Sequence, residues 1–144
     1  MIFLRHNLDF MVFGVLGLMS FLMLWFVIER YFYYARIKIE NFHHADSLNV
    51  ALTNHLTIIS TIGANAPYIG LLGTVIGIML TFYDMGQGGK VDVNTIMTGL
   101  SLALKATAAG LLVAIPAIMF YNALLRKVDV INARWREYQD NIKK

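Results

Sequence analysis

Three long runs of apolar residues dominate the pattern of this chain. The first, Phe10 to Ile28, has 19 residues and is interrupted by one serine and two glycines. The second runs from Ile58 to Phe82, and the third, Ile96 to Leu125, has 30 residues. A helix needs about 20 residues to cross the apolar core of a bilayer. We therefore expect a single all-α membrane domain over residues 1–144, with three transmembrane helices near residues 10–28, 64–83 and 95–123.

A short amphipathic helix is predicted between the first two runs. Apolar residues recur there at helical intervals, namely Leu48, Leu52, His55 or Leu56, and Ile59. Asp46 or Ser47 is placed to cap the start of this helix. It would lead directly into the second transmembrane helix.

The third helix is predicted to continue beyond the membrane, because an apolar stripe extends into the C-terminal tail. Its members are Leu125, Val128, Ile131, Trp135, Tyr138 and Ile142. A lone helix would expose this stripe to water. We expect it to be covered by the short helix, by neighbouring copies of the chain, or by both.

Lysine and arginine predict the orientation. The loop after the first run holds Arg30, Arg36 and Lys38, and the C-terminal tail holds six more, against Arg5 and Lys90 on the other side. Basic residues concentrate in cytoplasmic loops. We therefore expect the N-terminus outside, residues 30–57 and 126–144 in the cytoplasm, and 84–94 as a short external turn from which Asp92 or Asn94 caps the third helix. The first run lacks the basic start and cleavage site of a signal peptide and is interpreted as a retained anchor.

Composition supports the membrane class and argues against several other functions. Hydrophobic residues make up 58% of the chain, charged residues 15%, and cysteine is absent. The basic residues flank apolar runs, so nucleic-acid binding is not expected. His43, His44 and His55 lack a metal-ligand spacing, and no nucleophile, base and orienting acid occur together. We expect no enzyme activity, no metal and no cofactor.

Small and hydroxyl-bearing residues form stripes within the second and third runs. Gly70, Thr74, Gly77 and Thr81 share one helical face, and Gly73 with Gly77 forms a small-xxx-small pair. The third run carries a similar stripe of Ala103, Thr107, Gly110, Ala114 and Ala117. Both stripes favour close helix packing. Pro116 removes a hydrogen bond to the Leu112 carbonyl, so a bend is expected there.

Lys105 is the one charged residue deep within the third run. A charge near the bilayer midplane costs about 2.5–3.5 kcal/mol on insertion scales, so it normally faces a cavity or an acid. Helical spacing groups it with Asn94, Thr98 and Ser101 on a polar face. Asp84 and an acid on another chain are both candidate partners for this lysine.

Two long motifs carry a resemblance to a known family. "APYIGLLGTVIGIMLTF" and "LALKATAAGLLVAIPAIMFYN" resemble the second- and third-helix signatures of the ExbB/TolQ/MotA family of proton-channel subunits. The motifs cover about 40 residues. Three spans with an external N-terminus also fit this family, whereas the MotA branch has four.

The resemblance implies a ring-shaped homo-oligomer, a pentamer, in the inner membrane of a Gram-negative bacterium. Its second and third helices would surround a pore that holds an ExbD-like single-span partner, with Thr74 and Thr107 lining the pore and protons as the coupling ion. A TonB-like protein would carry the energy to outer-membrane transport, and membrane lipids would surround the ring. Two alternatives remain open: a TolQ-like role in envelope integrity, and a passive helical scaffold.

The chain departs from the family pattern at two positions. The family usually carries a glutamate five residues before the third-helix threonine, where this chain has Leu102, and Lys105 occupies a normally apolar site. We expect Lys105 to anchor a partner carboxylate or a neighbouring subunit. The cytoplasmic loop is also shorter than usual, which predicts a smaller cytoplasmic vestibule.

Overall fold

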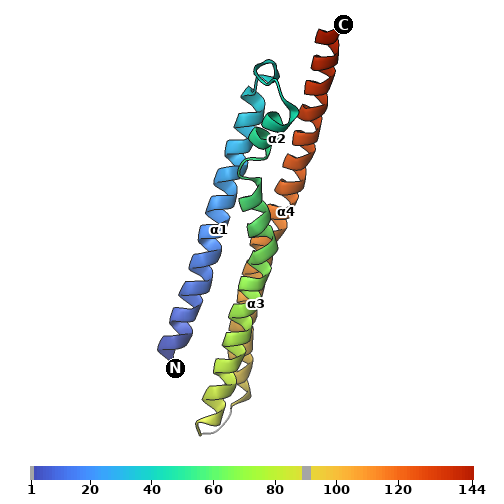
Figure 1. Cartoon of the computed structure of the whole chain (residues 1–144). Coiled ribbons are helices and arrows are strands. Elements are labelled where there is room, and N and C mark those ends of the chain that lie inside the picture. Colours follow the sequence, from blue (N-terminus) through green and yellow to red (C-terminus); the bar gives the residue numbers. More distant parts are fainter. Residues whose placement is uncertain (1, 89–91) are drawn as a thin grey trace.

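Three long helices lie side by side in the computed structural model, which describes residues 2–88 and 92–144. They are α1 (Ile2–Arg36), α3 (Leu56–Gly86) and α4 (Val93–Lys143). The 3-10 turn η1 (Ile39–Asn41) and the short helix α2 (Ala45–Thr53) connect α1 to α3. Figure 1 shows α2 and the C-terminus at one end of the bundle and the N-terminus nearer the other. The first of these is called the α2 end below.

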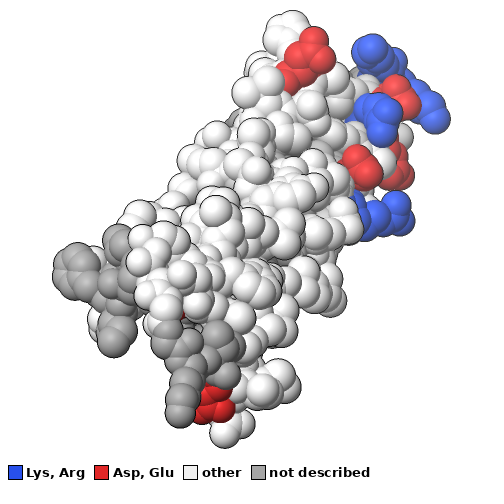
Figure 2. Space-filling view, turned by 90° about the horizontal axis from the view of Figure 1, so that it is seen from below, with Lys and Arg blue, Asp and Glu red and all other residues white. Residues whose placement is uncertain are grey.

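All three long helices are apolar and long enough to cross a membrane, which confirms the predicted all-α class with three candidate spans. Each helix extends past the apolar run that predicted it. α4 has 51 residues, which corresponds to about 75 Å at 1.5 Å per residue. The surface seen in Figure 2 is uncharged over most of its area, and lysine and arginine side chains gather along one edge.

The helix starts agree with the capping predictions in one case and not in the other. Asp92 caps α4 by accepting a hydrogen bond from the Asn94 amide at 3.1 Å, as expected. The prediction for α2 was wrong, because this helix begins at Ala45 and its N-cap is His44, whose side chain makes no capping bond. Ser47 instead donates its hydroxyl to the His44 carbonyl at 3.0 Å. The chain becomes helical before either expected cap.

His55 separates α2 from α3. Its backbone adopts the left-handed conformation (φ 68°), so the amphipathic segment is two helices that meet at a sharp break. The buried stripe consists of Leu48, Leu52, Leu56 and Ile59. Of the two residues that the sequence offered for the third position of this stripe, Leu56 occupies it and His55 does not. The His55 ring instead stacks on Phe26, with ring centroids 4.6 Å apart.

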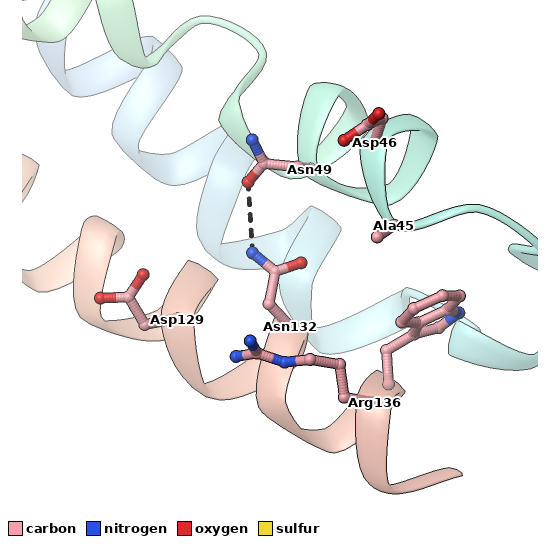
Figure 3. A pocket seen from close by; sticks show the side chains of 7 residues that line it. Ala45, Asp46, Asn49, Asp129, Asn132 and Arg136 are labelled. Carbon is pink, nitrogen blue, oxygen red and sulfur yellow. Dashed lines mark hydrogen bonds between the residues drawn. The ribbon is translucent and has the colours of Figure 1, made fainter. Parts of the chain in front are cut away.

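The larger of two apolar clusters extends into the α2 end and is built from α1, α2, α3 and residues 117–135 of α4. In α4, Val128, Ile131 and Trp135 are buried, so α1 and α2 cover much of the predicted C-terminal stripe within one chain. Two polar contacts fix this packing: the Trp135 indole donates to the Phe42 carbonyl at 2.9 Å, and the Asn132 amide donates to Asn49 at 3.2 Å (Figure 3). Ile142 lies beyond the cover and is 59% exposed.

Candidate functional site in the seam between α3 and α4

Small residues bring α3 and α4 into backbone contact along most of their shared length, here called the seam. A Cβ atom on Gly70 would lie 2.5 Å from the Ala106 carbonyl oxygen, and one on Gly110 would lie 2.6 Å from that of Ala66. Contacts this short are not tolerated without movement of the backbone. The seam therefore requires glycine at both positions.

The two other glycines of the α3 stripe also face the seam. A Cβ on Gly77 would lie 2.8 Å from the Ala103 Cβ, and one on Gly73 would lie 2.9 Å from the Ala106 Cβ. Gly73 also faces Val12 of α1, at 3.1 Å. Every glycine of the α3 stripe thus marks a place where another helix approaches closely.

Thr74 and Thr107 come together across this seam. Their hydroxyl oxygens are in hydrogen-bond contact, and the Thr74 hydroxyl also lies 2.8 Å from the Ala103 carbonyl as a donor. Thr74 is only 6% exposed, while Thr107 is half-buried. If Thr74 donates to the carbonyl, Thr107 donates to Thr74, because each hydroxyl has a single proton. The pair is a polar point in an otherwise apolar wall, partly open on the Thr107 side.

Lys105 lies on the outer surface of α4, away from the seam. Asn94, Thr98 and Ser101 are exposed with it, while Ala103 and Ala106 on either side of it are buried against α3. Within residues 2–88 and 92–144, no ion pair or hydrogen bond engages Lys105. A single protomer therefore presents a cation outward from the apolar part of α4.

Asp84 of the same chain is too distant to be the partner of Lys105. Thr81 lies against Gly99, so Asp84 falls three residues further from Lys105 along the seam. The resulting separation of about nine residues corresponds to roughly 14 Å of helix. This distance rules out Asp84 and leaves an acid on another chain as the candidate partner.

Pro116 lies inside α4, which continues as a helix on both sides of it. Pro67, which no prediction from the sequence concerned, lies inside α3 in the same way. Neither proline ends its helix, so both helices accommodate the missing amide donor.

Arg30 has a structural role that its position beside the first apolar run does not indicate. It is 2% exposed, and its guanidinium donates to the Ala51 carbonyl at 2.8 Å and to Glu29 at 2.5 Å. Tyr34, one turn further along α1, donates to the Leu52 carbonyl at 2.5 Å. These two side chains satisfy carbonyls at the C-terminal end of α2 and hold it against α1. The one feature of the sequence that groups Arg30 with Tyr34 is their spacing of four residues, which places both on one face of a helix.

The histidines and acids do not form a metal site in the part of the chain that the structure describes. His43 and His44 are exposed at the start of α2, and His55 packs on Phe26. The chemistry that the structure offers is therefore a hydroxyl pair within a close helix seam, and an outward-facing cation.

Three apolar helices of membrane-spanning length, two of them packed along a glycine-rich seam, define a multi-pass membrane protein. The chain belongs to the MotA/TolQ/ExbB proton channel family, whose model matches residues 35–137.

Several curated relatives cover most of the chain. The chain is 56% identical over 136 residues to the biopolymer transport protein ExbB of Helicobacter pylori strain J99, an alignment that covers 94% of each protein. It is 51% identical over 125 residues to ExbB of Aquifex aeolicus, covering 87% of this chain and 84% of the relative. ExbB of Neisseria gonorrhoeae is 45% identical over 76 residues, which are 53% of this chain but 34% of that longer protein.

Proposed function

We propose that this chain is the channel-forming subunit of a proton-driven motor that energises TonB-dependent transport across an outer membrane. In this proposal it forms a ring, a pentamer, around an ExbD-like single-span partner, and a TonB-like protein receives the movement. A proton crossing the membrane releases about 2.3 kcal/mol per 100 mV of potential. The single observation that carries the proposal is the 56% identity to an ExbB protein over 94% of both chains.

The proton pathway is proposed to pass the Thr74–Thr107 pair. Both hydroxyls lie among small and apolar residues, where an isolated polar group is costly and a paired one is retained. The half-buried Thr107 leaves one side of the pair accessible to a water molecule or to a partner's carboxyl group. A hydroxyl both donates and accepts, so the pair suits a group whose protonation changes.

The proposed orientation places the α2 end in the cytoplasm and the N-terminus in the periplasm. Nine lysine and arginine residues belong to two segments: residues 30–38, at the end of α1 and just after it, and residues 126–144, at the C-terminal end of the chain. Figure 1 shows these two segments at the same end of the bundle, as required if both face one compartment. The positive-inside rule then assigns that compartment to the cytoplasm of a Gram-negative bacterium.

Lys105 is proposed to contact an acid on another chain. Its outward position on α4 and the lack of an ion pair within the described residues make it available between protomers or toward the central partner. An unpaired ammonium at this depth is costly, so assembly would supply the missing anion. The Lys105→Met variant should lose assembly or uptake, and an intact, active complex would remove Lys105 from the mechanism.

The experiment that tests the proton pathway compares threonine-to-valine variants in a strain lacking the chromosomal copy. Thr74→Val and Thr107→Val delete a hydroxyl at nearly constant volume, and Thr61→Val makes the same change on the exposed side of α3. We expect the first two to lose proton-driven uptake of a ferric siderophore at normal protein level, and Thr61→Val to retain it. Full uptake in both seam variants would favour a passive scaffold.

The phenotype of the deletion separates the two motor systems within the family. Loss of iron-complex uptake supports the ExbB role. Detergent sensitivity and division defects with normal uptake would instead indicate the TolQ-like role in envelope integrity. Native mass spectrometry of the chain purified with its co-expressed partner would give the subunit number.

A further inference from the structure

A basic groove opens between α1 and α4 at the α2 end, on a side distinct from the seam. It has a volume of about 310 Å³. Arg126, Lys127 and Arg134 of α4 supply its charge, with Tyr34 and Ala35 of α1 and the side chains of Val130 and Ile131 completing the walls. None of these lining residues is acidic. The nearby Asp129 lines a separate groove with Asp46 and Arg136 (Figure 3).

The three cations are held on one side of α4 and remain exposed to a ligand. Arg126, Val130 and Arg134 follow one another at intervals of four residues, so both guanidinium groups project from the same helical face. Lys127 is anchored from α1, because its ammonium lies 4.7 Å from the centre of the Tyr31 ring. All three cations are exposed, and none of them has an ion pair with a described residue.

The groove lies at the depth of phospholipid headgroups. Arg126 directly follows the third apolar run, which ends at Leu125. On the α1 wall, Ala35 continues a stripe that passes back through Tyr31 to Ile28 and Leu24, at steps of four, three and four residues. Ile28 and Leu24 are exposed apolar side chains that would face acyl chains in a bilayer. A cationic groove therefore opens directly onto a lipid-facing apolar surface.

We propose that this groove binds the phosphodiester headgroup of an anionic phospholipid, whose acyl chains lie along the Leu24–Ile28 side of α1. Arginine suits a phosphate because its planar fork can donate two hydrogen bonds to it. Basic pockets between transmembrane helices are sites where such headgroups bind. A soluble phosphate would use the cations alone, whereas a phospholipid uses both the cations and the adjoining apolar stripe. The proposal relies on the three membrane-spanning helices and not on proton transport.

Native mass spectrometry tests this site by measuring lipid binding to the purified complex. The complex is titrated either with phosphatidylglycerol or with phosphatidylethanolamine that has the same acyl chains. The test variant is Arg126→Gln/Lys127→Gln/Arg134→Gln. Its control, Arg136→Gln/Lys143→Gln/Lys144→Gln, removes the same charge nearer the C-terminus. Each cation near an anionic headgroup contributes about a fivefold gain in affinity, so the test variant should lose on the order of a hundredfold. The control should bind phosphatidylglycerol like the unmodified chain.

Ala35→Phe provides a second variant that fills the groove and keeps all three cations. It should also weaken phosphatidylglycerol binding, and it keeps the proposal testable if the triple variant does not fold. Equal affinity for the two lipids, or equal losses in test and control variants, would overturn the proposal. Displacement of the lipid by millimolar glycerol phosphate would assign the groove to soluble phosphates and likewise overturn it.

Discussion

Gly70 and Gly110 meet across the seam so closely that a Cβ atom on either would lie 3.1 Å from the Cα of the other. This relationship sets the separation of α3 and α4 at the level of the threonine pair. Since Thr74 lies one turn from Gly70, any widening at the glycines would pull its hydroxyl away from Thr107.

Gly70→Ala should therefore destabilise the fold. Its methyl group would lie 2.5 Å from a backbone oxygen, an atom that no side-chain rotation can move away. We expect a loss of about 1–3 kcal/mol in the free energy of unfolding, measured by titration with a denaturing detergent. Gly17→Ala is the matched control, since nothing lies within 4 Å of the added Cβ. Equal stability of the two variants would show that the seam can widen freely.

Removal of the Arg30 side chain should loosen α2. In Arg30→Met the Ala51 carbonyl loses its 2.8 Å donor in a largely buried site, at a cost of about 1–3 kcal/mol. Arg36→Met removes an exposed arginine from the same helix and should have little effect. Limited proteolysis of the 37–55 segment distinguishes them, with faster cleavage expected only in the Arg30 variant.

The left-handed backbone at His55 predicts an unusual order of stability among variants at this position. Valine strongly disfavours φ near 68°, so His55→Val should destabilise the chain by at least about 1–2 kcal/mol. In His55→Gly, the conformational cost that histidine bears at this φ is removed, but the stack on Phe26, worth about 0.5–1.5 kcal/mol, is lost as well. The two effects are similar in size, so the stability of His55→Gly should be nearly unchanged.

Asn54 provides the control for this order, because its φ of −57° is one that any residue adopts. Asn54→Gly should cost about 0.5–1 kcal/mol. Thermal unfolding followed by circular dichroism ranks all three variants. A His55→Val variant as stable as His55→Gly would contradict the conformational argument.

Trp135→Phe should increase hydrogen exchange in the 42–53 segment. The indole donates to the Phe42 carbonyl at 2.9 Å and is 9% exposed, so phenylalanine leaves a carbonyl without its donor. The expected cost is about 1–2 kcal/mol, or roughly a 5- to 30-fold rise in exchange through local opening. Trp25→Phe, at a residue that is 61% exposed, should leave exchange in this segment unchanged.

The features that the sequence predicts well depend on length and period. Helix length and apolarity are properties of continuous segments, which is why the three candidate spans follow from the runs alone. A period of 3.6 residues likewise groups Gly70, Thr74 and Gly77 on one face. Which helix that face meets is decided by tertiary packing, and so is the contact between Thr74 and Thr107.

Features set by contacts distant in the chain were harder to predict. His55 has no propensity for the left-handed region comparable to glycine, and its conformation accompanies the turn of the chain from α2 into α3. Arg30 looks like an ordinary flanking charge until Ala51, 21 residues away, approaches its guanidinium. The wrong caps of α2 arose similarly, since propensity marks Asp46 and Ser47 while the fold starts the helix at Ala45.

The unbroken length of α4 has a mechanical consequence. One helix of 51 residues extends from the seam past α2, so a change of tilt at the seam would move its C-terminal end. From Thr107 to its end at Lys143, α4 is about 54 Å long, so a tilt of about 5° at Thr107 would displace that end by roughly 5 Å. A slight rearrangement beside Thr107 would thus be enlarged at the C-terminal end of α4, and the contact between Trp135 and the Phe42 carbonyl, just before α2, lies within the part of the helix that moves.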